Sequence, residues 1–151
     1  MSNDQSSQLT IKPFGALREL VNSYDAFCRG VSADVQKFGL SIEQFDVIAT
    51  LGNTTGLSLV QLGEKTLLNL PNLHQVLDSL EEDLLIYRDL PADKPMMIVK
   101  LTPAGEKIFA VIFPIHMAYL QRCFGQLNQF ELDMLQAYLR RLTESFAQKI
   151  S

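Results

Sequence analysis

Apolar residues recur every three or four positions along most of the chain, which is the spacing of one face of an amphipathic helix. The first such stretch begins at Pro13 and ends before Gly39, as expected for a proline in a first helical turn and a glycine beyond a helix end. The same spacing predicts a mostly helical protein with helices at about residues 13–38, 41–51, 58–67, 69–84, 103–124 and 128–150.

Polar residues at several predicted helix starts follow the capping-box spacing, in which Ser, Thr or Asn precedes Gln or Glu by three positions. The pairs are Ser41 with Gln44, Ser58 with Gln61, and Asn128 with Glu131. Leu67 and Leu84 are expected to extend the apolar faces of the third and fourth helices. The caps therefore fix where helices begin, and the apolar spacing fixes which faces they bury.

Residues 85–101 lack the helical spacing. Two short extended runs, 85–89 and 96–101, flank a polar loop that contains two prolines, Asp93 and Lys94. This pattern predicts a β-hairpin whose loop, residues 90–95, projects as a wing. The fold class expected from the element order is mostly α with a small β-hairpin wing.

The apolar faces at both ends of the chain are longer than the middle segment can cover. We therefore expect the helices at about 13–38 and 103–150 to pair with the same helices of a second copy. Residues 1–10 are polar and are expected to form a flexible N-terminal arm, followed by a single domain over 11–151. The residues expected at the dimer interface are Leu139, Leu142, Phe146 and Ile150.

Composition narrows the function classes. The net charge of -4 and the two cysteines exclude a globally basic protein and a disulfide framework, and predict a reducing, cytoplasmic location. The polar start is unlike a signal peptide, and no run approaches the roughly 20 apolar residues of a membrane span. No phosphate-binding loop, nucleophile motif or metal-ligand spacing is present, so we expect no enzyme activity, no cofactor and no metal.

Three segments resemble the MarR family of transcriptional regulators: LSIEQFDVIATLGNTTGLSLVQLGEKT (Leu40–Thr66), VLDSLEEDLLIYR (Val76–Arg88) and IVKLTPAGEKIF (Ile98–Phe109). The turn formed by Leu101, Thr102 and Gly105 is the sharpest signal. The resemblance implies a winged helix-turn-helix lobe at about 41–102, flanked by N- and C-terminal dimerisation helices at about 13–38 and 103–150.

The resemblance also implies a homodimer that binds duplex DNA and regulates transcription. The helix from about Asn69 to Glu82 would enter the major groove, with the wing near the minor groove. The implied DNA contacts are Asn69, Asn72, His74, Gln75, Ser79, Arg88 and Lys94. From the residues alone, a solvated helix face is the favoured interpretation of the polar group at 69–75, and the resemblance makes base and phosphate contact an equally good one.

Family members often respond to small phenolic or anionic ligands bound between the dimer region and the DNA-binding lobe. The residues implied here are Tyr24, Phe27, Phe45 and Phe113. Other members respond to thiol oxidation. For Cys28 and Cys123 we favour inert, buried thiols, because each lies on an apolar helical face.

The chain departs from the family pattern where DNA would be bound. Ser79 replaces an arginine, Leu84 replaces a glycine at the helix end, and Pro95 follows Lys94 where the wing arginine is expected. Residues 53–101 carry four basic and seven acidic side chains, which offers few cations for phosphate. The alternative hypothesis is a degenerate winged-helix dimer that has lost strong DNA binding and acts through a protein partner.

Overall fold

The computed structural model describes residues 11–148. The chain divides into two compact units, Met1–Phe109 and Ala110–Ser151, and each is considered by itself. The expected N-terminal arm and Ile150 lie outside the described residues, so the arm and the interface role of Ile150 stay predictions.

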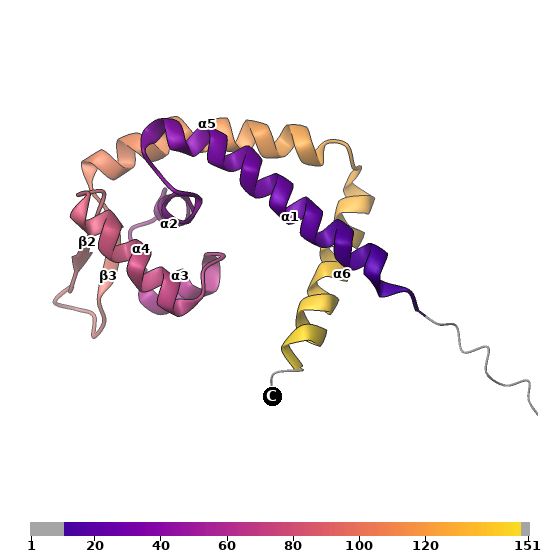
Figure 1. Cartoon of the computed structure of the whole chain (residues 1–151). Coiled ribbons are helices and arrows are strands. Elements are labelled where there is room, and N and C mark those ends of the chain that lie inside the picture. Colours follow the sequence, from indigo (N-terminus) through magenta and orange to yellow (C-terminus); the bar gives the residue numbers. More distant parts are fainter. Residues whose placement is uncertain (1–10, 149–151) are drawn as a thin grey trace, which may run out of the picture. The chain divides into compact units, whose positions relative to one another are not determined.

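The observed elements confirm a mostly helical fold with a small hairpin (Figure 1). Their bounds are α1 Pro13–Val35, η1 Gln36–Phe38, α2 Ile42–Leu51, β1 Leu57–Ser58, α3 Leu59–Lys65, α4 Leu70–Glu82, β2 Ile86–Asp89, β3 Ile98–Leu101, α5 Pro103–Phe124 and α6 Gln129–Gln148.

The predicted capping boxes are confirmed. In α2 the Ser41 hydroxyl accepts the Gln44 backbone N–H at 3.1 Å, while the Gln44 side chain accepts the Ser41 N–H at 3.0 Å. The same reciprocal pairs are present at Ser58 and Asn128. Because the first N–H groups of a helix have no partner within it, these side chains define where each helix begins.

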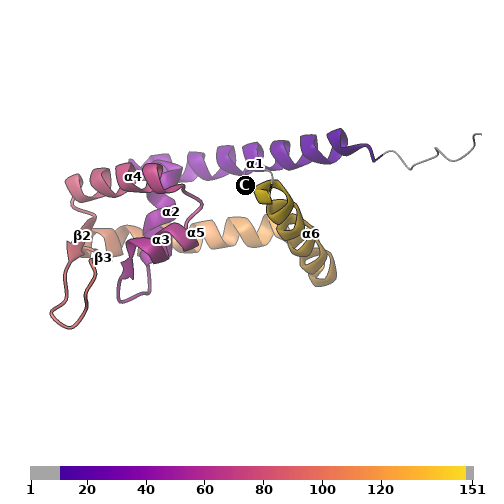
Figure 2. The ribbon, with the colours of Figure 1, turned by 90° about the horizontal axis from the view of Figure 1, so that it is seen from below.

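The hairpin belongs to a three-stranded antiparallel sheet in the order β1-β3-β2. Ile86 pairs with Leu101 and Asp89 with Ile98, so the loop between the strands extends away from α2, α3 and α4 as a wing (Figure 2). The third strand, β1, was not predicted. It has only two residues, too few to show an alternating pattern, and it pairs Leu57 with Val99.

The core of the first unit joins the end of α1, the helices α2 to α4 and the inner face of the sheet. Its most deeply buried side chains include Val35, Val47, Ile48, Leu51, Leu62, Leu73, Leu77, Leu80 and Ile86. The prediction that Leu67 and Leu84 extend this apolar surface is wrong, since they are 73% and 72% exposed. Each follows the last residue of its helix, where the backbone no longer keeps the helical direction.

The turn at Leu101, Thr102 and Gly105 closes the base of the wing. The Thr102 N–H donates to the Leu85 carbonyl at 3.0 Å, and the Thr102 hydroxyl caps α5 by accepting the Gly105 N–H at 3.1 Å. A Cβ on Gly105 would overlap the Leu85 carbonyl oxygen. Glycine at this position is therefore required by the close approach of two backbones.

In the second unit, α6 has no buried residue. The predicted interface residues Leu139, Leu142 and Phe146 are 36%, 42% and 55% exposed on the single chain. Among the described residues, no single helix has the length and apolar composition to cross a membrane, although α5 and α6 taken together across their bend pass that test of length and composition.

The end of α4 stores backbone strain at a non-glycine residue. Leu84 has φ of 59° and follows a Schellman-type ending, with Leu85 N–H donating to the Leu80 carbonyl at 2.9 Å and Leu84 N–H to Glu81 at 3.0 Å. A left-handed backbone conformation costs a residue that carries a side chain about 1 kcal/mol or more. The Leu84 side chain is mostly exposed, so its burial offsets little of this cost.

We expect Leu84→Gly to raise the free energy of unfolding by about 1 kcal/mol, since glycine adopts this conformation without a steric penalty. Denaturant titration followed by circular dichroism measures the change. Leu84→Ala is the matched control, because it removes the exposed side chain but keeps the strained Cβ, and its stability should stay near wild type. Equal stabilisation by both variants would contradict the strain argument.

Candidate nucleic-acid interface

Helix α4 presents a polar face to solvent. Leu73, Leu77 and Leu80 are buried, which leaves Asn72 and Gln75 exposed on other sides of the helix. The Asn69 side-chain oxygen accepts the Asn72 N–H at 3.0 Å. Asn69 is therefore the helix cap, and its side-chain oxygen is already hydrogen-bonded within the protein.

An open depression of about 470 Å³ lies between the start of α2 and the exposed side of α4. Polar side chains dominate its lining, which consists of Ser41, Glu43, Gln44, Asn72, Gln75, Val76 and Ser79. The Gln44 amide donates to the Ser79 hydroxyl at 3.2 Å, and that hydroxyl donates to the Val76 carbonyl at 2.8 Å. Ser79 thus joins α4 to α2 and is half-buried.

A smaller cavity of about 140 Å³ lies on another side of α4, against α3 and the sheet. It is lined by Leu59, His74, Leu77, Arg88, Met97 and Val99. His74, which the sequence groups with Asn72 and Gln75, therefore belongs to the wing side of α4. The structure divides the predicted contact group between two sides of one helix.

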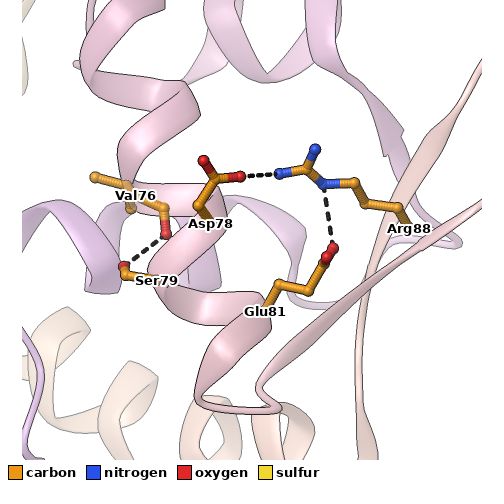
Figure 3. A network of polar contacts seen from close by, with 5 residues as sticks. All are labelled: Val76, Asp78, Ser79, Glu81 and Arg88. Atoms are coloured by element: carbon orange, nitrogen blue, oxygen red, sulfur yellow. Dashed lines mark hydrogen bonds and ion pairs between the residues drawn. The ribbon is translucent and has the colours of Figure 1, made fainter.

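Arg88 is held by two carboxylates of α4 (Figure 3). Its Nη2 lies 2.7 Å from Asp78 Oδ1, and its Nε lies 3.2 Å from Glu81 Oε2. The two ion pairs fasten strand β2 to α4 and neutralise the arginine. A carboxylate on α4 and an arginine on the following strand are visible in the sequence, but their pairing depends on the tertiary fold.

A second cation of the lobe is also paired. Lys100 Nζ lies 3.0 Å from Asp89 Oδ2, and this hydrogen bond raises the pKa of the Lys100 amine. The remaining two cations of residues 53–101, Lys65 and Lys94, take part in none of the ion pairs found among the described residues. Lys94 is exposed in the wing loop, as the sequence predicts.

The segment between α3 and α4 is tied to α2 by Asp46. The Leu67 N–H donates to Asp46 Oδ2 at 2.7 Å. Burial raises the pKa of the Asp46 carboxyl, the charge of Glu43 adds to the increase, and the Leu67 hydrogen bond opposes it. This tether, which the sequence did not reveal, holds the residues just before α4 against α2.

The residues implied for ligand binding are distributed over both units. Phe45 on α2 is buried at 3% exposure, Tyr24 on α1 is 58% exposed, and Phe113 belongs to the second unit. None of the four lines either depression described above. A hydrogen bond with Cys28 raises the pKa of the Tyr24 hydroxyl.

The two cysteines differ in exposure. Cys28 is half-buried, and Cys123 is exposed on the single chain, so the expectation of burial is wrong for Cys123. An apolar helical face buries a thiol only where another element covers it. Within residues 11–148, no cluster of three or more His, Cys, Asp or Glu side chains could hold a metal ion.

No protein-family model matches the chain. Among curated proteins, it is 28% identical over 124 residues to the HTH-type transcriptional regulator MhqR of Bacillus subtilis, covering 82% of this chain and 86% of MhqR. It is also 28% identical over 132 residues to the transcriptional regulator HosA of Escherichia coli, covering 87% of this chain and 94% of HosA.

Solved structures share the fold over nearly the whole chain. A MarR/EmrR family transcriptional regulator from Acinetobacter matches with a TM-score of 0.77 at 20% identity, covering 91% of this chain and 99% of that one. MepR of S. aureus, solved in complex with DNA, matches with a TM-score of 0.72 at 20% identity, covering 90% of this chain and 99% of MepR. Bordetella bronchiseptica BpsR, whose DNA binding is regulated by 6-hydroxynicotinic acid, matches with a TM-score of 0.70 at 25% identity, covering 87% of this chain and 99% of BpsR.

The raised pKa of Asp46 gives a stability prediction with a definite sign. A carboxyl whose pKa is raised by folding stabilises the fold when protonated, and that contribution is lost as pH rises through the raised pKa. Asp46→Asn keeps an acceptor for Leu67 without a buried charge. We expect its stability relative to wild type to be greatest at neutral pH and to shrink as pH falls toward the ordinary carboxyl value of 3.8.

Thermal unfolding of both proteins across this pH range measures the difference. Asp46→Ala is the comparison that removes the acceptor as well as the charge, and it should be less stable than Asp46→Asn at every pH by about 1 kcal/mol, because the Leu67 N–H loses its partner. A difference between Asp46→Asn and wild type that does not change with pH would contradict the assignment.

Proposed function

We propose that the chain is a winged helix-turn-helix transcriptional regulator of the MarR family, and that it binds duplex DNA as a homodimer in the cytoplasm and regulates transcription. The observation that carries the proposal is the exposed polar face of α4, opposite the leucines that fix this helix on α2 and the sheet. A recognition helix needs one face anchored in the core and one free to enter the major groove.

The first half of α4 is the part suited to contact base edges. In helix-turn-helix proteins the N-terminal residues of the recognition helix reach the bases, while neighbouring elements contact phosphates. Asn72 and Gln75 occupy that half, and the Asp46 tether holds the segment before it. Solved MepR provides a relative of the same fold bound to DNA.

The dimer is supported by apolar side chains that the single chain leaves exposed. They occur on α1, at Phe14, Leu17 and Val21, and on α6, at Leu139, Leu142 and Phe146. Large exposed apolar surfaces mark interaction sites in soluble proteins. A second copy of the chain is the occupant we propose, since two-fold pairing places the same surface on both partners.

We extend the proposal to regulation by a small aromatic or anionic molecule. The support is the solved BpsR, whose DNA binding is regulated by 6-hydroxynicotinic acid. Tyr24, Phe27 and Phe45 are the proposed contacts within the first unit.

A second candidate function, binding to a basic protein partner, is favoured by the charge of the lobe. Residues 53–101 hold seven acids against four bases, and Arg88 and Lys100 are already paired internally. Few cations therefore remain for phosphate, whose neutralisation supplies most of the non-specific affinity for DNA.

DNA binding should be weak and should depend only shallowly on salt. Pro95→Arg restores a guanidinium to the wing, and we expect it to strengthen binding and to steepen the slope of log K against log salt by about 0.9, the value for one further phosphate contact. Fluorescence anisotropy titrations on selected and random duplexes at several salt concentrations give the slope.

Pro95→Gln is the control, since it removes the same proline without adding charge, and it should leave the slope unchanged. If wild type binds no duplex at low salt, and Pro95→Arg changes nothing, binding to a basic protein partner becomes the supported function.

The dimer proposal predicts that charged residues on the exposed face of α6 separate the subunits. We expect Leu142→Glu with Phe146→Glu to halve the mass measured by analytical ultracentrifugation, or to give aggregated protein, because two buried charges oppose pairing. Glu144→Gln lies between them and should leave the mass unchanged. A wild-type protein that stays monomeric at high micromolar concentration would overturn the proposal.

A further inference from the structure

We propose that α4 reads A·T base pairs in the major groove, with the Asn72 and Gln75 amides on adenine and Leu70 against a thymine methyl group. The inference rests on the proposed function, because it assigns the class of sequence that the same helix would select. It depends on which side chains α4 exposes and on how the neighbouring cation is held.

Helix α4 has no arginine or lysine side chain to contact guanine. Guanine is most often read by arginine or lysine, whose donors match its two major-groove acceptors. The helix sequence, LPNLHQVLDSLEE, contains neither residue. Ser79 occupies a position in the third turn, but its hydroxyl is already engaged with Gln44 and Val76.

The guanidinium of Arg88, which lies beside the helix, is already ion-paired. Arg88 on β2 contacts Asp78 at 2.7 Å and Glu81 at 3.2 Å, so both sides of its fork are occupied by carboxylates of α4 (Figure 3). The same contacts occupy Asp78, a carboxylate that could otherwise accept from the cytosine amino group. One ion-pair network therefore engages both the arginine beside α4 and a carboxylate that could contact cytosine.

The amides of Asn72 and Gln75 remain available. Both side chains are exposed, line the same depression beside α2, and have no side-chain hydrogen bond among those found in residues 11–148. An amide can donate to adenine N7 or accept from its N6 amino group, and it can do both at once. Three residues of helix rise about 4.5 Å, close to the roughly 3.4 Å between base pairs, so the two amides can serve neighbouring pairs.

Apolar side chains surround the start of the helix. Leu70, the first residue of α4, is 53% exposed, and Leu67 before it is 73% exposed. Apolar contact with the thymine C5-methyl group is the one direct base contact that such side chains make in the major groove. Amides for adenine and leucines for thymine match the two members of one base pair.

The test begins with selection of duplexes from a random library by the full-length protein. We expect each half-site to show A·T pairs where α4 enters the groove. In the best duplex, 7-deazaadenine at these positions removes the N7 acceptor, and uracil in place of thymine removes the methyl group. Neither change alters the minor groove, so a tenfold or larger loss with 7-deazaadenine identifies reading in the major groove.

Protein variants assign the contacts. Gln75→Ala and Asn72→Ala should each lose most of the preference for adenine over 7-deazaadenine at one position, while Leu70→Ala should lose the preference for thymine over uracil. Gln36→Ala, an exposed amide in η1, is the matched control and should keep both preferences.

Enrichment of G·C pairs at these positions, or unchanged preferences in all three α4 variants, would overturn the inference while leaving DNA binding intact. Failure to bind any duplex at low salt would instead overturn the proposed function.

Discussion

The carbonyl oxygen of Leu85 lies where three parts of the lobe meet. It accepts the Thr102 N–H, it lies against Gly105 too closely to admit a Cβ, and its residue follows the turn that ends α4. The Thr102 hydroxyl meanwhile donates to the Leu84 carbonyl. Because the end of α4, the base of the wing and the start of α5 share these few atoms, backbone contacts fix the direction of α4 relative to the wing.

Ion pairs within the lobe determine how much positive charge it presents to a charged partner. Arg88 and Lys100 stabilise the attachment of the wing strands, but the carboxylates that hold them also cancel their charge. Exposed pairs of this kind contribute little to stability, about 0–1 kcal/mol. Their larger effect concerns the proposed DNA binding, in which a phosphate would have to compete with Asp78 or Asp89 for the same cation.

Local signals predicted much of this arrangement. The caps at Ser41, Ser58 and Asn128 were read correctly because the interaction joins residues three positions apart. Likewise, the change from helical spacing to two short extended runs located the hairpin. Such signals need no knowledge of the rest of the fold, which is why they were reliable.

Signals that depend on tertiary structure were missed. The strand β1 has two residues and becomes recognisable only through β3. Asp46 reaches Leu67, and Gln44 reaches Ser79 across 35 positions, so spacing alone could not reveal either bond. The exposed positions of Leu67 and Leu84 had a related cause, since apolar spacing continues past the residue where each helix ends.

The strand pairing also has a consequence for how the lobe folds. Each capped helix can begin from contacts within a few residues, and β2 and β3 are joined by a short loop. By contrast, pairing Leu57 with Val99 closes a loop of about forty residues, whose entropic cost must be met before the pair contributes. The β2–β3 hairpin can therefore form without β1, whereas β1 can pair only once β3 is in place.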